Sequence, residues 1–337
     1  MISYRWCGEL TADDRDEVLG LVRRAADYDA EAGFSAVDPA AVDGRSDDEQ
    51  RVWHLPIRAR RDLSARPDVP WVVVAYLHLA VDTDGFGVGQ FVVDPDYRSR
   101  GIATLLVEEL GLDTAGDGGW AGTGARVLRA WAYGSHPASE RLTSRFGVPA
   151  VRRQWTLVRH LSGPWAAPLD PVPTDAALAE PASVEEFGGA MDAVLSATTM
   201  PPRNRDILSR AADSGSTVIA SVDGRPAGFV RFDPTLHEHE ELRAAWIGAL
   251  AVADRASGRG LGSALLVCAL AALRDAGAQL ALMRIDPDDE RAVRMCRLLS
   301  FEQAEAHACY QVGSMTHETN DDICNALTDA TVARSVL

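Results

Sequence analysis

Residues 93–104 read Val93-Asp-Pro-Asp-Tyr-Arg-Ser-Arg-Gly-Ile-Ala-Thr104, and residues 252–263 read Val252-Ala-Asp-Arg-Ala-Ser-Gly-Arg-Gly-Leu-Gly-Ser263. In each, an apolar stretch runs into a polar turn with small residues and then into an amphipathic run. This is the order strand, loop, helix N-terminus. A single turn of this kind is as readily an ordinary connection between a strand and a helix as a binding site. Two copies in matching contexts predict a duplicated domain.

Both turns have the chemistry of an anion site. A helix N-terminus carries unpaired N–H groups and the positive end of the helix dipole, and glycine lets the backbone approach an anion closely. The guanidinium groups of Arg98, Arg100 and Arg259 add positive charge beside these groups. We therefore expect each turn to bind a pyrophosphate, the first more tightly because it carries more charge.

The composition limits the class of protein. A chain of 337 residues, 47% of them hydrophobic, can bury the cores of two domains. A formal charge of −16 disfavours nucleic acid as a partner. The sequence shows neither a membrane-spanning run nor a signal peptide, so we expect a cytoplasmic protein without a membrane partner. Five scattered cysteines indicate reduced thiols and argue against a metal site. The absence of lysine excludes Schiff-base chemistry, pyridoxal phosphate and a Walker-type loop.

The order of expected elements repeats along the chain. Residues 163–174 are rich in proline, which cannot continue a helix or a central strand, and we expect them to form a linker. The linker separates an N-terminal domain, residues 1–162, from a C-terminal domain, residues 175–312. Residues 313–337 match no expected element and are interpreted as a tail.

Four local patterns predict individual elements. Thr11-Ala-Asp-Asp14 is typical of a helix start. Short helices are expected around Asp48–Arg61 and at Asn204–Ala212. Asp223-Gly224 predicts the turn of a β-hairpin.

The spacing Arg98-x-x-Gly101-x-Ala103, after an apolar strand, resembles the acyl-CoA pyrophosphate loop of the GCN5-related N-acetyltransferase (GNAT) family. The second copy keeps Gly260-x-Gly262 but has Ser257 where the family usually has Arg or Gln. The two-domain layout resembles the mycothiol synthase family over most of residues 1–312. The resemblance implies an α/β fold of two tandem GNAT-like domains, each a mixed, mostly antiparallel sheet flanked by helices.

The resemblance also implies an acyl-CoA cofactor, most simply acetyl-CoA. It would bind through the backbone of the two strand ends and through the two loops. In the first half these residues are Phe91, Val92, Val93, Arg98, Ser99, Arg100, Gly101, Ile102, Ala103 and Thr104. In the second half they are Leu250, Ala251, Val252, Ser257, Gly258, Arg259, Gly260, Leu261, Gly262 and Ser263.

Acetyl transfer to an amine benefits from a general base with a pKa near the working pH. His237, His239 and Glu240 belong to a polar cluster between two expected strands of the second half, where a base would meet the acceptor. A solvated acidic turn explains the same cluster. His136 follows an expected strand of the first half and suits a base, a helix cap or a neutral core histidine.

Two residues depart from what the resemblance implies. Cys296 stands where the family often has a tyrosine acid, and Trp246 stands where mycothiol synthases have a glutamate. Cys296 could protonate a thiolate, since a free thiol has a pKa of ~8.5, but it also suits a buried apolar position.

These observations predict an acyl-CoA-dependent N-acyltransferase that acetylates the primary amine of a small molecule, without a metal. The alternative is a non-catalytic acyl-CoA-binding or scaffold protein with degenerate GNAT-like domains, which the missing tyrosine and glutamate favour. The acceptor, the acyl chain length, the catalytic half and the oligomeric state are left open by the sequence.

Overall fold

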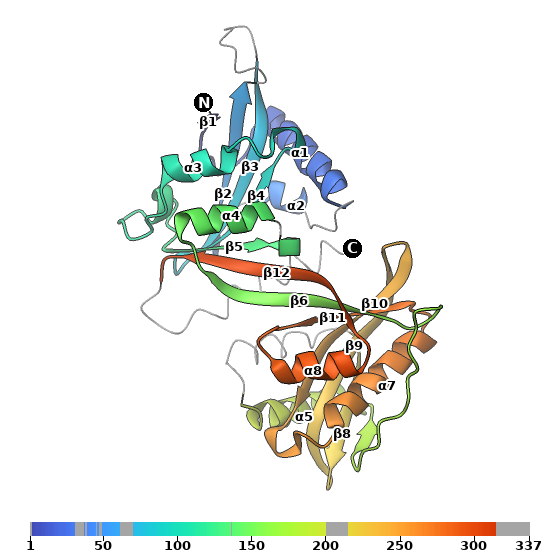
Figure 1. Ribbon diagram of the computed structural model, residues 1–337. Helices are drawn as coiled ribbons and strands as arrows, with labels where there is room; N and C mark the ends of the chain where they lie inside the picture. Colours follow the sequence, from blue (N-terminus) through green and yellow to red (C-terminus); the bar gives the residue numbers. More distant parts are fainter. Residues whose placement is uncertain are drawn as a thin grey trace. The chain divides into compact units, whose positions relative to one another are not determined.

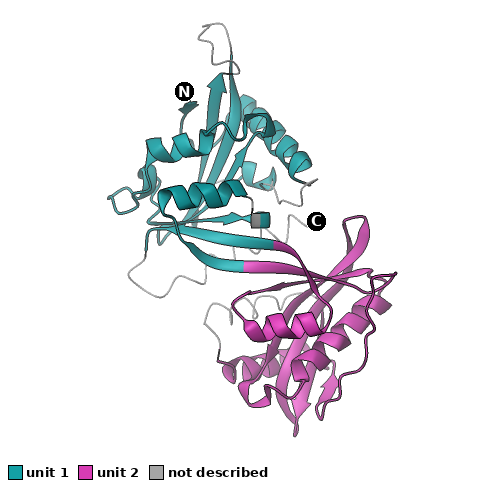
Figure 2. Cartoon of the chain, viewed as in Figure 1, with its two compact units in different colours: residues 1–153, 306–337 teal, residues 154–305 magenta. Residues whose placement is uncertain are grey.

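The computed structural model describes residues 2–30, 37, 39–44, 46, 49–60, 70–135, 137–199 and 215–314. His136, the helix expected at Asn204–Ala212 and nearly all of the tail lie outside these residues. The chain forms two compact units, coloured separately in Figure 2: unit 1 is Met1–Arg153 with Ala306–Leu337, and unit 2 is Gln154–Glu305. The division falls inside two strands, β6 (Ala150–His160) and β12 (Glu302–Val312).

Unit 1 contains a mixed sheet with helices packed on it (Figure 1). Its other elements are β1 (Ile2–Tyr4), α1 (Ala12–Ala30), α2 (Pro39–Val42), β2 (Gln50–Arg60), β3 (Trp71–Asp82), β4 (Phe86–Val93), η1 (Pro95–Tyr97), α3 (Ile102–Leu110), η2 (Trp120–Gly122), β5 (Val127–Ala132), η3 (Tyr133–Ser135) and α4 (Pro137–Phe146). The strand order is β1-β2-β3-β4-β5-β12-β6. Neighbours from β1 to β4 are antiparallel, β4 and β5 are parallel, and β5 and β12 are antiparallel.

Unit 2 repeats this plan. Its elements besides the end of β6 are β7 (Ala177–Ala179), α5 (Val184–Ser196), β8 (Ser216–Val222), β9 (Arg225–His239), β10 (Leu242–Val252), η4 (Asp254–Ala256), α7 (Leu261–Asp275), β11 (Leu280–Ile285) and α8 (Glu290–Leu298). The strand order is β6-β11-β10-β9-β8-β7, with β10 and β11 parallel and the other neighbours antiparallel. The mixed α/β fold predicted from the sequence is confirmed.

Helices cover both faces of each sheet because alternate strand residues point to opposite sides. In unit 2, Val230 packs in the core beneath α7 and α8, and its neighbour Phe229 packs in a second core with α5. In unit 1, Tyr76 packs with α1, and its neighbour Leu77 packs with α3. Among the described residues, no helix is long and apolar enough to cross a membrane.

Two local predictions are confirmed. At the start of α1, Asp14 N–H donates to Thr11 Oγ1 at 3.2 Å, so Thr11 caps the helix. Between β8 and β9, Asp223 and Gly224 have φ values of +52° and +72°. Positive φ at both positions is what the two-residue hairpin turn requires.

The expectation of a short helix around Asp48–Arg61 is wrong, because Gln50–Arg60 form strand β2. The strand pairs with β3 along its whole length, from Gln50 opposite Asp82 to Arg60 opposite Trp71. The run contains β-branched and aromatic residues, which favour a strand once a partner strand is present. This pairing is a tertiary contact that the local sequence does not show.

The Pro-rich residues 163–174, expected to separate two domains, lie inside unit 2. No helix or strand falls within them. Near their start, the buried Arg159 donates from Nη2 to the carbonyl oxygens of Ala167 and Pro168, at 3.0 Å each. The segment is therefore fixed to the body of unit 2 by hydrogen bonds to its backbone.

Candidate functional site

In unit 2 the central strand β10 separates from its parallel neighbour β11. The ladder between them covers only Ala244–Ile247, opposite Leu280–Met283, although both strands continue. Beside this point the register of β10 against β9 shifts between Ile247 and Ala249, around the exposed Gly248. A bulge bends the strand that carries it. From Gly248 to Val252, β10 therefore has no pairing with β11, and we call this unpaired stretch the opening.

The backbone of β10 presents hydrogen-bonding groups to this opening. Ala253 N–H donates to Ala227 C=O of the β9 side at 2.9 Å. Because successive residues of a strand direct their groups to opposite edges, Leu250 and Val252 face the opening. The Val252 carbonyl accepts a long bond of 3.4 Å from Thr198 Oγ1. An extended ligand in the opening could pair with Leu250 and with Val252 N–H as an additional strand would.

The opening leads to the N-terminus of α7. Gly260 precedes the helix with a φ of +75°, in the left-handed region that favours glycine, and no side chain caps this end. The first helical bond runs from Ala264 N–H to Gly260 C=O at 3.0 Å. The N–H groups of Leu261, Gly262 and Ser263 precede that bond and point along the helix axis toward the loop, where they can bind an anion.

Unit 1 has the same arrangement. The ladder between β4 and β5 covers Phe86–Gly89 only, and Asp94 N–H donates to Val74 C=O at 2.9 Å, so Phe91 and Val93 face the opening. Gly101 precedes α3 with a φ of +78° and no side-chain cap. A β-carbon at Gly101 would meet no atom within 4 Å. The first loop thus offers open space in front of free N–H groups, which fits a phosphate group.

The arginines of the first loop are not equally exposed. Arg98 forms a two-point ion pair with Asp29 of α1, at 2.5 and 2.9 Å, and also donates to the Val93 carbonyl at 3.1 Å. Its guanidinium also lies 5.2 Å from the ring centre of Tyr28. Arg98 therefore ties α1 to the loop, and only Arg100, which lies over the Tyr97 ring, remains beside the helix N-terminus.

The second loop is bordered by groups far away in sequence. The Arg259 guanidinium forms an ion pair with Asp175, just after the Pro-rich segment. A β-carbon at Gly260 would lie 3.5 Å from Val172 of that segment. From α8, Arg291 Nη1 lies 3.4 Å from Ser257 Oγ. The sequence analysis missed both Asp175 and Arg291, and nothing in the local pattern around either residue signals the contact.

Of the base candidates in unit 2, His237 is placed best. It lies on β9, its ring stacks on Trp246 with centroids 6.1 Å apart, and the Arg284 guanidinium lies 4.9 Å from the same Trp246 ring. Burial, then the charge of His239, lowers the pKa of His237, and its Nε2 has no hydrogen-bond partner in the described part of the chain. His237 is therefore a neutral base candidate on β9, opposite Ala244 of the paired part of β10.

The other two candidates of the cluster, His239 and Glu240, differ in their placement. His239 ends β9, two residues after His237, and so shares its face. Glu240 occupies the turn to β10 with a φ of +49° and is exposed. The structure brings the two histidines together and leaves Glu240 at the solvent-facing turn.

A polar cluster that the sequence analysis missed lies in unit 1, on strands β2 and β3. His54 Nε2 donates to the Gly44 carbonyl at 3.1 Å, so His54 Nδ1 accepts from Tyr76 O–H at 2.6 Å. His78 lies beside His54 and opposite Gln90, where the opening begins. Burial lowers the pKa of His78 to about 4, so it is neutral. The sequence feature that could have revealed this cluster is a histidine within the apolar run Trp71–Asp82.

Cys296, the candidate acid, is a core residue. It is 1% exposed and packs with the buried side chains beneath α7 and α8. Burial raises the pKa of its thiol to about 12, which makes it a weaker acid than an ordinary thiol. The structure therefore favours the packing interpretation of Cys296.

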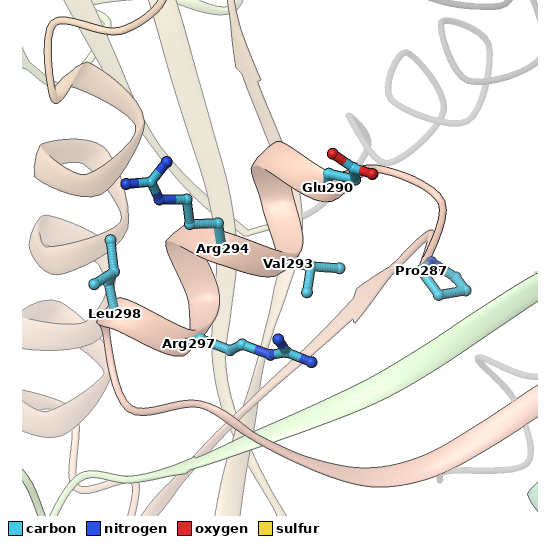
Figure 3. A pocket seen from close by; sticks show the side chains of 6 residues that line it. All are labelled: Pro287, Glu290, Val293, Arg294, Arg297 and Leu298. Carbon is cyan, nitrogen blue, oxygen red and sulfur yellow. The ribbon is translucent and has the colours of Figure 1, made fainter.

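A pocket of about 370 Å³ lies on the outer side of α8 (Figure 3). It is lined by Pro287, Glu290, Val293, Arg294, Arg297 and Leu298. No residue of β10 or of the second loop lines it, so it is distinct from the opening. Figure 3 shows Arg294 and Arg297 projecting to different sides of the helix.

The comparisons with known proteins agree with this geometry. The pattern of the family described as "Acetyltransferase (GNAT) family" matches residues 187–301, which include β10, the second loop and α7. The mycothiol acetyltransferase of Sanguibacter keddieii is 30% identical over 313 residues, 88% of this chain and 92% of its own length. That of Salinispora arenicola is 29% identical over 309 residues, with the same coverage.

Two solved structures share the fold. A tandem GNAT protein from the clavulanic acid biosynthesis pathway has a TM-score of 0.58 at 17% identity, over 94% of this chain and 100% of its own. A GCN5-related N-acetyltransferase from Sphaerobacter thermophilus has a TM-score of 0.56 at 15% identity, over 92% and 95%. The prediction of a tandem GNAT acetyltransferase is confirmed. The chain belongs to the GNAT acetyltransferase family, with mycothiol acetyltransferases as its full-length relatives.

Proposed function

We propose that this chain transfers an acetyl group from acetyl-CoA to the primary amine of a small molecule, with the reaction in unit 2. The observation that carries the proposal is the opening at Gly248–Val252, which leads to the uncapped N-terminus of α7 within the matched family region. The name of the relatives supports an acceptor of the mycothiol type. The amine of the mycothiol precursor is therefore the first acceptor to test.

Different residues of unit 2 would bind the cofactor and transfer protons. The N–H groups that begin α7 would hold the pyrophosphate, and the backbone of Leu250 and Val252 would pair with the pantetheine arm. When bound, acetyl-CoA supplies the thioester carbonyl that the amine attacks. A β10 N–H near the bulge would donate to that carbonyl oxygen and stabilise the negative charge that develops there.

His237 is the base that we propose for the amine proton. A base must be deprotonated to act, and the lowered pKa of His237 keeps its ring neutral at neutral pH. His239 on the same face is the second proton acceptor. We do not assign the leaving thiolate's proton to Cys296, because a thiol with a pKa of about 12 holds its proton too firmly. His136, the remaining base candidate, lies outside the described residues and is given no role in this reaction.

The test is kcat/KM against pH for the parent and for the double variant His237→Ala/His239→Ala. In the parent, the rate should rise through a pKa below the ordinary histidine value of ~6.5 and flatten above it, apart from the amine's own titration near ~8. The double variant should lose the lower limb and keep its affinity for acetyl-CoA. His160→Ala, a half-buried histidine on β6, is the matched control. An unchanged profile in the double variant would remove both histidines from the mechanism.

A further inference from the structure

The two phosphate loops differ in charge at the position three residues before the glycine that precedes the helix. When they are aligned on Gly101 and Gly260, Arg98 of the first loop corresponds to Ser257 of the second. The second loop thus lacks the basic side chain at the place where an arginine could contact a pyrophosphate. A serine hydroxyl can donate one hydrogen bond to phosphate but brings no charge.

Arg291 of α8 brings a guanidinium to this place. Its Nη1 lies 3.4 Å from Ser257 Oγ, which is long for a hydrogen bond, so the contact holds the group only loosely. Hydrogen bonds from Thr199 lower the pKa of the Asp254 carboxyl, and the charge of Arg291 contributes to the lowering. Asp254 belongs to η4, the short turn that opens the loop. Two observations therefore place the Arg291 charge at the loop.

The other arginines of the loop are engaged. Arg259 forms an ion pair with Asp175, and Arg255 donates to the Pro226 carbonyl at 2.6 Å. Arg291 is exposed and, within the described ranges, forms no ion pair. It is the guanidinium most readily available to an incoming anion.

In unit 1 the arginine lies on the loop and not on the helix that corresponds to α8. Arg291 lies eight residues before Leu299, the residue that follows α8, and the residue eight before Phe146, the last residue of α4, is Ala138. Unit 1 therefore has an arginine on the loop and an alanine on the helix, and unit 2 has a serine on the loop and an arginine on the helix. Each unit therefore has one arginine at this pair of positions, although in unit 1 the guanidinium of Arg98 is held by Asp29 of α1.

We propose that Arg291 binds the phosphate groups of acyl-CoA in unit 2 and replaces the charge that its loop lacks. This inference rests on the proposed function of unit 2. The flexible side chain needs only to leave a weak contact with Ser257 to meet a phosphate oxygen in front of the α7 N-terminus. A guanidinium can donate two parallel bonds to phosphate, which makes the contact directional as well as charged.

The experiment is calorimetry of acetyl-CoA binding in a Gly101→Val background. A branched side chain at this position fills the open space in front of the first loop, so the calorimeter measures acetyl-CoA binding to unit 2 alone. Arg291→Ala should weaken binding by on the order of tenfold. Arg297→Ala, the same change on another side of α8, is the matched control and should leave binding unchanged. Circular dichroism shows whether each variant is folded.

Two further measurements identify the contact. S-acetyl-pantetheine lacks the nucleotide and the pyrophosphate, so Arg291→Ala should not change the affinity of the protein for it. The rate with saturating S-acetyl-pantetheine as the acetyl donor should also be the same in the parent and in Arg291→Ala. In a Gly260→Val background, which obstructs the second loop, Arg291→Ala should have no effect on the acetyl-CoA binding that remains. Equal affinities of the parent and Arg291→Ala for acetyl-CoA would overturn the inference while leaving the proposed function intact. No binding in the Gly101→Val background at all would instead refute the assignment of the reaction to unit 2.

Discussion

Asp175→Asn is expected to tighten the binding of acetyl-CoA in unit 2. Asp175 forms an ion pair with Arg259, and Val172 and Pro173 of the Pro-rich segment just before Asp175 border Gly260. The carboxylate therefore lies where it competes with a phosphate for the Arg259 guanidinium. Asparagine keeps the size of the side chain and removes the charge, so the substitution isolates this competition.

The exposure of the pair limits the size of the effect. The side chains of Arg259 and Asp175 are 44% and 59% exposed, so solvent screens their attraction. Exposed ion pairs contribute ~0.2–1 kcal/mol, which corresponds to a gain in affinity of up to about fivefold. The free energy of unfolding should change by less than about 1 kcal/mol for the same reason. The gain should shrink as salt is added, because screening weakens the competing pair.

Calorimetry of acetyl-CoA in the Gly101→Val background measures the gain, at two salt concentrations. Asp170→Asn removes an exposed carboxylate from the same segment, where the described residues show no ion pair for it, and is the matched control. Equal tightening by both variants would mean that only net charge matters. Weaker binding by Asp175→Asn would refute the competition and show that Asp175 orients Arg259 toward the phosphate.

Two further substitutions test the roles of buried and paired side chains. Cys296→Ala should retain kcat/KM, because the thiol packs in a core and its pKa is about 12. It should lower the free energy of unfolding by about 1 kcal/mol through the small cavity that it leaves. A large loss of kcat in a folded variant would show that Cys296 is catalytic. Arg98→Ala should destabilise the protein by about 2 kcal/mol in thermal unfolding, because it leaves the mostly buried Asp29 carboxylate unpaired. Loss of acetyl-CoA affinity without loss of stability would instead make Arg98 a direct phosphate ligand.

The sequence identified the parts of the site that depend on local backbone geometry. Gly101 and Gly260 both adopt the left-handed conformation that lets a strand end turn into a helix start. Such turns are encoded within a few residues, so their spacing is visible in the chain. The apolar strands before them were equally visible. The repeated turns predicted a duplicated domain, and the fold of each half was predicted through the resemblance of the first turn to the GNAT family.

The sequence could not show which charges are available at the loops. Arg98 and Asp29 are 69 positions apart, and Arg259 and Asp175 are 84 positions apart. Partners at such distances meet only through the tertiary fold, so local spacing carries no record of them. The cluster at His237 shows the same limit on a smaller scale. Five consecutive polar residues look equivalent in the sequence, but the strand and its turn place His237 against Trp246 and Glu240 in solvent.

The sequence did not show where the chain divides into its two units, for a related reason. Strands β6 and β12 each begin in one unit and end in the other, so neither a proline-rich segment nor a change in composition marks the boundary. β6 pairs with β11 over Trp155–His160, and β12 pairs with β5 over Ala308–Val312. A strand can pair along either edge, and its sequence pattern is similar whichever neighbour it takes.

The contacts of the arginines change the expected order of acyl-CoA affinity of the two loops. The first loop has the fuller family motif, which predicted the tighter site, yet its Arg98 is held by Asp29 and Val93. The second loop has the weaker motif, yet Arg291 stands beside it without an ion pair in the described structure. Affinity depends on the guanidinium groups that a phosphate can reach, since a paired arginine must first give up its partner. We therefore expect the affinities of the two units to follow the partners of their arginines, and Arg291→Ala and Asp175→Asn to shift unit 2 in opposite directions.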